Sequence, residues 1–140
     1  MTLFISDIDG TLLNAERTLS STTETTIRRA IGEGHTFVLC SSRPPSSMRG
    51  LEALYGGRDV PLIAYNGGFV VNSSGSVVLD VPIDADIAMQ IYEECTRLDL
   101  HGSFYSGEDW FAWRDDKWSA REAENTNCLL YTSPSPRDRG

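Results

Sequence analysis

Basic residues are scarce in this chain, which has 12 Lys and Arg against 20 Asp and Glu and a net charge of -8 at pH 7. They form no dense block that could follow a nucleic-acid backbone, so nucleic acid is not expected as a partner. Long apolar runs are also missing, since none approaches the ~20 residues of a membrane span, and the first residues lack the pattern of a signal peptide. The sequence therefore predicts a cytoplasmic protein with no membrane partner.

Cysteine is equally sparse. Cys40, Cys95 and Cys128 stand far apart, form no CxxC pair and are odd in number. Neither a disulfide framework nor a zinc site is indicated, and the three residues are expected to be reduced thiols. The length of 140 residues suits one compact domain or a fragment of a larger protein.

The last thirteen residues, 128–140, read CLLYTSPSPRDRG and change abruptly in composition. The part from Cys128 to Asp138 resembles the translation of a transposase-type sequencing adapter, so residues 128–140 are expected to be a non-native tail and are left out of the predicted fold. A natural disordered Ser/Pro tail is the alternative. With an adapter at this point, the natural protein is expected to have been cut off within a domain.

Three short apolar runs have the pattern of strands buried on both faces of a parallel sheet, at residues 3–5, 37–40 and 62–65. Helical stretches separate them. The first has Ser21 and Glu24 in the spacing of a capping box and stops at Gly34, and the second runs from about residue 46 to 55, before Gly56-Gly57. The alternation predicts the beginning of a doubly wound α/β fold, whose ligands gather at the carboxyl ends of the strands.

The pattern changes after Gly67. Residues 69–71 and 77–79 predict a β-hairpin, and Pro82 marks a boundary. An amphipathic helix is expected over 84–98 with Asp84 as its N-cap, followed by two short strands within 103–113 and a helix from 119 to 125. The predicted division is a partial core domain at 1–81, a partial α+β unit at 82–127 and the tail at 128–140.

Polar residues stand at the ends of all three predicted strands. Asp7 and Asp9 follow the first, the segment 41–43 follows the second, and Asn66 and Gly67 follow the third. The carboxyl ends of neighbouring parallel strands meet at one edge of a sheet, so these groups are expected to form a single site of about the size of a phosphate.

Two carboxylates at such an edge can divide the work of phosphoryl transfer. Asp7 can attack phosphorus, while Asp9 protonates the leaving oxygen and later activates water. Both would repel a phosphate dianion, so a divalent cation, most plausibly Mg²⁺ held by Asp7 and Asp9, is expected. Gly10 lets the backbone approach the phosphate. A solvated Asp-Gly turn is the plain alternative, whereas an EF-hand fails because Leu12 stands where its glycine belongs.

The run Asp7-Ile8-Asp9-Gly10-Thr11-Leu12 resembles the first motif of the haloacid dehalogenase superfamily, DxDGTL, nearly residue for residue. The segment 41–44, Ser-Ser-Arg-Pro, resembles the second motif, which commonly reads TGRP in the Cof-like branch. Asn66-Gly67 resembles the pair at which Cof-like proteins leave the third strand for their cap. The chain is therefore identified as a member of this superfamily, Cof-like subclass IIB, with its C-terminal part missing.

The resemblance implies an α/β fold with a Rossmannoid parallel sheet, of which the N-terminal half is present, and the start of an α+β cap. It implies a Mg²⁺-dependent phosphatase for small phosphorylated metabolites, sugar phosphates in particular, working through an aspartyl-phosphate. Ser41 would donate to a phosphoryl oxygen, and Ser42 replaces the usual glycine. Arg43 would pair with phosphate or with a nearby carboxylate. Asn66 would line the site, unless it merely forms a turn.

The family's third motif supplies a lysine and its fourth an acidic pair, and neither is found in this sequence. The one lysine, Lys117, lies between Asp116 and Trp118 and is expected on the surface. Two alternatives therefore stay open. One is a phosphotransferase or mutase that uses the same intermediate, and the other is an inactive fragment that lacks the lysine and acidic motifs.

Overall fold

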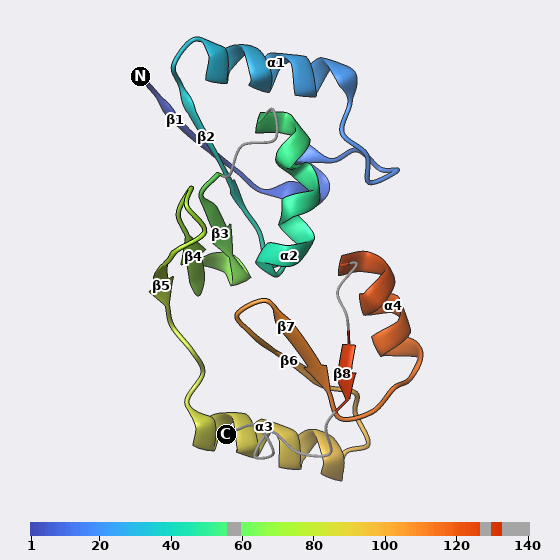
Figure 1. Ribbon diagram of the computed structural model, residues 1–140. Coiled ribbons are helices and arrows are strands. Elements are labelled where there is room, and N and C mark those ends of the chain that lie inside the picture. The colour runs from blue at the N-terminus through green and yellow to red at the C-terminus, as the bar shows by residue number, and fades with distance from the viewer. Residues whose placement is uncertain (56–59, 127–129, 133–140) are drawn as a thin grey trace. The chain divides into compact units, whose positions relative to one another are not determined.

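Strands β1 (Leu3–Ser6), β2 (Thr36–Cys40) and β3 (Leu62–Ala64) lie side by side and parallel, in the order of the sequence (Figure 1). The structure is a computed structural model that describes residues 1–55, 60–126 and 130–132. β4 (Phe69–Val71) and β5 (Val77–Asp80) extend the sheet as an antiparallel hairpin beside β3. The predicted parallel sheet and the hairpin are confirmed, and together they belong to the first of two compact units, Met1–Asp80 and Val81–Gly140.

The first helix, α1 (Ser21–Gly32), connects β1 to β2. Its N-cap is Ser20, whose hydroxyl accepts a hydrogen bond of 3.1 Å from the amide of Thr23. The predicted cap was one residue too late, because Ser20 and Ser21 both have side chains suited to the position and only the backbone decides between them. Ile27 is buried on the inner face of this helix.

The connection from β2 to β3 begins with α2 (Pro45–Met48) and continues as a 3₁₀ helix, Arg49–Tyr55. Pro44 and Pro45 at its start fit the backbone angles of a first helical turn and need no amide hydrogen bond there. The predicted helix is thus present, as a short α-helix followed by a 3₁₀ helix. Its predicted end at Gly56-Gly57 lies outside the described residues.

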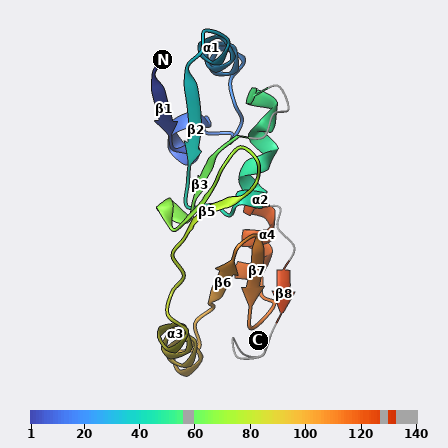
Figure 2. The same cartoon turned by 60° about the vertical axis from the view of Figure 1, so that its left-hand side comes forward.

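Both helices lie on the same side of β1, β2 and β3 (Figures 1 and 2), as right-handed crossovers in one direction require. The core fills the space between this side of the sheet and the helices. Leu39 and Met48 have no exposed surface, and Leu62 exposes 2%. The core consists of Ile8, Leu12, Leu13, Ile27, Leu39, Met48, Leu54, Leu62, Ala64, Phe69 and Val71.

Strand β1 departs from the prediction that it is buried on both faces. Leu3 exposes 58% of its surface and Ile5 exposes 56%. Within the described part of the chain β1 pairs with β2 alone, so it forms an edge of the sheet. Phe4 alternates with them, in register with Phe37 on the face that the helices cover, and even there it exposes 43% of its surface at the edge of the sheet. The prediction was wrong because an apolar run does not reveal whether a second layer covers the strand.

The second unit contains α3 (Ala85–Arg97), β6 (Ser103–Ser106), β7 (Asp109–Ala112), α4 (Lys117–Thr126) and β8 (Leu130–Thr132). β6 and β7 form the expected antiparallel pair, and β8 runs parallel to β7. β8 lies within the stretch that the prediction leaves out of the fold, but residues 130–132 do take part in a sheet. The side chain of Asp84 caps α3, as predicted, by accepting from the amide of Asp86. Trp110 is fully buried in this unit.

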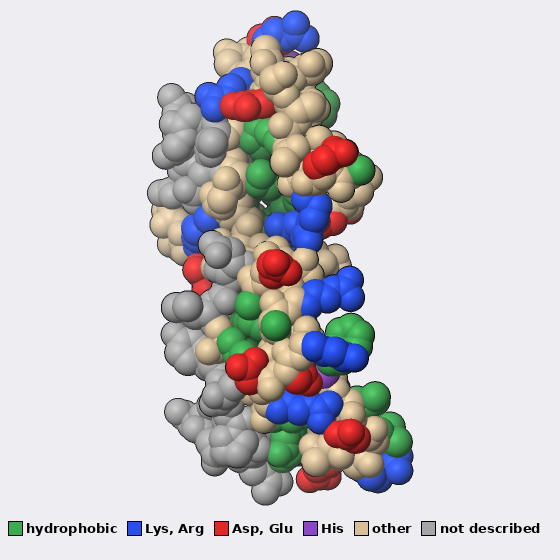
Figure 3. Space-filling model, turned by 90° about the vertical axis from the view of Figure 1, so that its right-hand side faces the viewer, with side chains coloured by type: hydrophobic (Ala, Val, Ile, Leu, Met, Phe, Trp, Pro, Cys, Tyr) green, Lys and Arg blue, Asp and Glu red, His purple; other side chains and the backbone are tan. Residues whose placement is uncertain are grey.

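No helix among the described residues is both long and apolar enough to cross a membrane. On the face shown in Figure 3, acidic and basic side chains of the described residues are intermixed and do not gather into one area of a single sign.

Candidate active site

The end of β1 turns sharply through the segment Ile8–Leu12. Ile8 is fully buried, so its side chain anchors the turn in the core while Asp7 and Asp9 on either side of it are exposed. The amide of Leu13 closes the turn with a hydrogen bond of 3.0 Å to the carbonyl of Ile8. Gly10 has a φ of 74°, a conformation that suits glycine and explains why the motif needs it.

Asp7 offers an exposed carboxylate at the carboxyl end of β1. Its Oδ1 accepts a hydrogen bond of 2.7 Å from the amide of Ile8. This bond fixes the direction of the side chain. The second oxygen accepts no hydrogen bond from the described residues that surround it, so an attacking lone pair is available there.

Asp9 is held by Arg43, which comes from the end of the neighbouring strand. Nε of Arg43 lies 2.7 Å from Oδ2 of Asp9, and Nη2 lies 2.7 Å from Oδ1. This is a bidentate, charge-assisted pair. Hydrogen bonds from Arg43 hold the pKa of Asp9 below its ordinary value of 3.8, because they favour the ionised form more strongly than partial burial disfavours it.

Ser41 is almost completely buried, with 2% of its surface exposed. Its amide donates to the carbonyl of Ile63 at 2.9 Å, and its hydroxyl oxygen accepts from the amide of Arg43 at 3.3 Å. A serine hydroxyl that accepts in this way still has its own proton to donate. Ser41 can therefore offer a fixed O–H donor at the end of β2.

The end of β3 contacts the same loop. The amide of Asn66 donates to the carbonyl of Ser41 at 2.9 Å. Asn66 itself is exposed and has a φ of 55°. Contacts thus connect Asp9 to Arg43, Arg43 to Ser41, and Ser41 to Asn66. Gly10 follows Asp9 directly, and Ser42 is exposed between Ser41 and Arg43. The three predicted strand ends do meet.

Arg17 belongs to this site and was not predicted. Its Nη2 lies 3.6 Å from Oδ1 of Asp9 and adds a second positive charge beside that carboxylate. The loop that carries it is closed by Asn14, whose side chain accepts from the amide of Thr18 at 2.8 Å. In the sequence, the loop is indicated only by the pair Asn14 and Thr18, whose polar side chains stand four residues apart and can hydrogen-bond across a turn. The sequence does not reveal that it folds back toward Asp9.

The donor chemistry of the site suits a hard cation such as Mg²⁺, which binds oxygen and often takes one or two carboxylates together with phosphate oxygens and water. The exposed Asp7 fits this role. Each oxygen of Asp9 accepts one hydrogen bond from Arg43, which leaves a further lone pair on each oxygen that a metal ion could use. No cluster of three or more His, Cys, Asp or Glu that could hold a metal occurs among the residues described.

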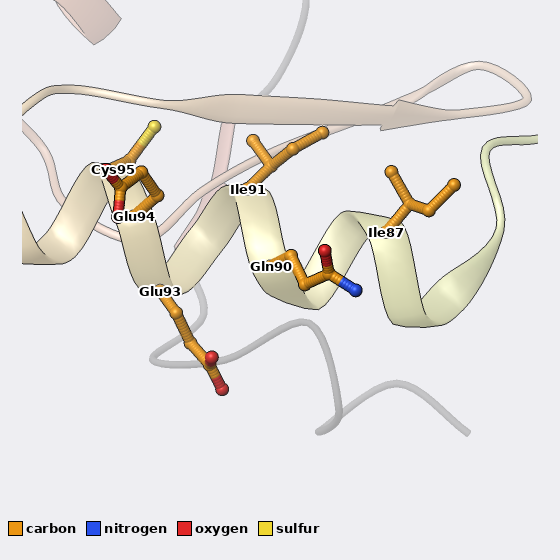
Figure 4. A pocket seen from close by; sticks show the side chains of 6 residues that line it. All are labelled: Ile87, Gln90, Ile91, Glu93, Glu94 and Cys95. Atoms are coloured by element: carbon orange, nitrogen blue, oxygen red, sulfur yellow. The ribbon is translucent and has the colours of Figure 1, made fainter.

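A separate groove beside α3 contains none of the predicted site residues. It is lined by Ile87, Gln90, Ile91, Glu93, Glu94 and Cys95. Figure 4 shows Ile87 and Ile91 pointing to one side of the helix and Glu93 to the other, as on any amphipathic helix. Lys117, the one lysine, begins α4 in the second unit; it is exposed, as expected, and its Nζ lies 5.0 Å from the centre of the Trp118 ring.

Asp115 and Asp116, which precede Lys117, have a structural task. Asp116 accepts from the amide of Trp118 at 2.8 Å and from the amide of Ser119 at 3.2 Å. It therefore caps the start of α4. Asp115 accepts a hydrogen bond of 2.7 Å from the hydroxyl of Ser119 in the same helix turn, so both carboxylates have partners at the start of α4.

Comparison with known proteins gives consistent matches. The family model of haloacid dehalogenase-like hydrolases matches residues 4–137. The 5-amino-6-(5-phospho-D-ribitylamino)uracil phosphatase of Bacillus subtilis is 26% identical over 102 residues, which are 73% of this chain and 35% of that protein. This chain spans between 35% and 48% of the length of the curated relatives it matches.

Solved structures agree on the fold. A haloacid dehalogenase-like hydrolase from Bacteroides thetaiotaomicron superposes with a TM-score of 0.87 at 22% identity, over 99% of this chain and 53% of that one. A sugar phosphatase of subclass IIB superposes with a TM-score of 0.77 at 18% identity, over 94% of this chain and 52% of that one. With the family model matching nearly the whole length and the DxDGTL turn in place, the chain belongs to the haloacid dehalogenase-like hydrolases.

Proposed function

We propose that this chain carries the nucleophilic part of a Mg²⁺-dependent phosphatase that hydrolyses small phosphorylated metabolites, sugar phosphates among them. The observation that supports this most is the arrangement at the ends of β1 and β2. An exposed Asp7 carboxylate stands two residues from an Asp9 that Arg43 holds by both oxygens. Two carboxylates in such different surroundings can take two different roles.

In the proposed reaction, Asp7 attacks phosphorus and forms an aspartyl-phosphate as the bond to the leaving alcohol breaks. Asp9 gives a proton to the leaving oxygen, then takes one from the water that hydrolyses the intermediate and frees Asp7. The hydroxyl of Ser41 donates to a phosphoryl oxygen and stabilises its charge. Each carboxylate is thus restored at the end of the cycle.

Arg43 has two possible partners within one site, the Asp9 carboxylate and the phosphoryl group. In the structure it binds Asp9, and its side chain exposes only 14% of its surface. A phosphate dianion offers the same bidentate geometry with more charge. We infer that bound substrate draws Arg43 toward the phosphoryl group, which weakens its hold on Asp9 and allows Asp9 to be protonated.

Bound Mg²⁺ would neutralise the charge of the phosphoryl group and the carboxylates, with Asp7 and Asp9 as the protein ligands in this chain. The names of relatives support the substrate class. One is a phosphatase of a phosphorylated ribitylamino compound, and another is a sugar phosphatase. Because the chain spans about half or less of these proteins, the activity is proposed for the site as a whole.

The proposal is tested by measuring phosphate release from p-nitrophenyl phosphate and a panel of sugar phosphates, with and without Mg²⁺. Release that requires Mg²⁺ and is lost in Asp7→Asn is expected. Glu33→Gln, which removes an exposed carboxylate of the same unit at the end of α1, serves as the matched control and should keep full activity. Isomerisation of a sugar phosphate without phosphate release would instead identify a mutase, and no turnover at all would support the inactive fragment.

A further inference from the structure

Three consecutive residues at the end of β3 adopt left-handed backbone conformations. The φ angles are 51° for Tyr65, 55° for Asn66 and 100° for Gly67. Glycine accepts this region freely and asparagine tolerates it, but a bulky aromatic residue rarely does. Backbone strain of this kind persists only where the surroundings enforce it, and it is concentrated at functional sites.

The strained residues are held by local contacts. The carbonyl of Tyr65 accepts from the amide of Gly68 at 3.1 Å. The ring of Tyr65 lies 6.2 Å, centroid to centroid, from the ring of Phe69, which exposes only 6% of its surface in the core. The ring contact with the buried Phe69 ties the side chain of Tyr65 to the core in this conformation.

The unusual turn directs two backbone amides at the loop that follows β2. The amide of Asn66 donates to the carbonyl of Ser41 at 2.9 Å, and the amide of Tyr65 donates to the carbonyl of Arg43 at 3.4 Å. The same loop also bonds to β3 itself, because the amide of Ser41 donates to the carbonyl of Ile63. Residues 63 to 66 thus hold both ends of the segment that carries the hydroxyl and the guanidinium of the site.

We propose that Tyr65 and Asn66 are positioning residues, whose left-handed backbone places Ser41 and Arg43 for the phosphoryl group. The inference rests on the proposed function only for the identity of the group that Ser41 and Arg43 bind. The way residues 65 and 66 position that loop does not depend on any ligand. It assigns the role of Asn66 to its backbone, whereas the family resemblance assigns it to the side chain lining the site.

Substitutions at position 66 separate these two roles. Glycine removes the carboxamide but adopts the left-handed conformation without cost, whereas alanine removes the same group and disfavours that conformation. If the backbone matters, Asn66→Gly keeps the arrangement and Asn66→Ala loosens it. Gly75→Ala is the control, because Gly75 has a φ of 77° in the β4–β5 hairpin of the same unit, and a Cβ there would meet no atom within 4 Å.

The experiment is amide hydrogen exchange on the full chain, read by NMR together with the Nε–H resonance of Arg43, which reports its bond to Asp9. We expect the amide of residue 66 to exchange about tenfold faster in Asn66→Ala than in Asn66→Gly, the size of effect that a left-handed alanine implies. The Nε–H signal should broaden in Asn66→Ala alone. Gly75→Ala should leave both readouts unchanged.

Equal exchange of the residue 66 amide in Asn66→Ala and Asn66→Gly would overturn the inference. It would also be overturned if Gly75→Ala changed the two readouts as much as Asn66→Ala does, because the effect would then reflect a loss of overall stability. Neither readout requires turnover. A failure of the proposed phosphatase activity therefore leaves this result intact, and a failure here leaves the activity assay unaffected.

Discussion

Arg43 reaches from the end of β2 to bind both oxygens of Asp9, with Nε 2.7 Å from Oδ2 and Nη2 2.7 Å from Oδ1. The pair keeps Asp9 ionised, the state in which a carboxylate can accept a proton from water, but it also makes Asp9 a weaker base because it favours the charged form. Its other proposed task, protonation of the leaving group, requires that Arg43 first give up part of this contact.

Replacing Arg43 by Gln is expected to raise the pKa of Asp9, because the hydrogen bonds that favour its charged form are lost. Carbon-13 NMR of the Asp9 carboxyl during a pH titration measures this directly. Arg17→Gln is the comparison and should raise the same pKa less, because Nη2 of Arg17 is 3.6 Å from Asp9 and its side chain is 49% exposed. An equal effect of the two substitutions would show that total charge, and not the bidentate bond, controls Asp9.

The same pair predicts how stability depends on pH. Since the pKa of Asp9 is lowered in the folded state, its contribution is fully present above the unfolded-state pKa and is lost as pH falls through the folded-state value. At neutral pH the wild type should exceed Arg43→Gln by about 0.5–1 kcal/mol in free energy of unfolding, a value reduced by solvent screening at the partly exposed Asp9. Urea titrations below about pH 4 should show this difference shrinking; a constant difference would contradict the assignment.

Truncation of apolar side chains should have unequal effects in β1 and β2. Leu39 has no exposed surface, so Leu39→Ala is expected to cost about 2–5 kcal/mol. Ile5 is 56% exposed, and Ile5→Ala should cost less than about 1 kcal/mol. Urea unfolding followed by far-ultraviolet circular dichroism compares the two, and similar losses would mean that the outer face of β1 is covered in solution.

Gly102 permits a close approach in the second unit. A Cβ at this position would lie 1.7 Å from Cη2 of Trp113, whose ring is packed edge-on against Tyr92 at 5.2 Å and stacked near His101. Gly102→Ala should therefore destabilise this unit by about 1–3 kcal/mol, the usual cost of overpacking.

Tryptophan fluorescence measures this effect, because Trp110, Trp113 and Trp118 are the three tryptophans of the chain and all belong to the second unit. Gly32→Ala, where a Cβ would meet no atom within 4 Å, is the control and should leave the transition in place. An unchanged transition in Gly102→Ala would show that the Trp113 ring can move aside.

Much of the first unit could be predicted because its signals are local. The apolar runs, the double proline and the Asp-x-Asp-Gly turn each specify a short segment, and the rule that parallel strands end at one edge then brings Asp9, Ser41, Arg43 and Asn66 together. Asp84 as the cap of α3 is of the same kind, since a cap depends on its own helix start.

The features that sequence reasoning missed depend on contacts between distant segments. Arg17 reaches Asp9 only because its loop folds back over the site, and nothing in the residues around it specifies that direction. The left-handed Tyr65 is stabilised by Phe69 and by the loop after β2, against its own local preference. The exposure of Ile5 depends on whether another layer covers the strand.

The most direct test of the whole account is mass spectrometry of the chain after incubation with p-nitrophenyl phosphate and Mg²⁺ and a rapid acid quench. The account predicts one phosphoryl group on the peptide that contains Asp7. The group should be absent in Asp7→Asn and should accumulate in Asp9→Asn, which forms the intermediate from a good leaving group but activates water poorly. A phosphoryl group that persists in Asp7→Asn, or that never appears in either the wild type or Asp9→Asn, would contradict it.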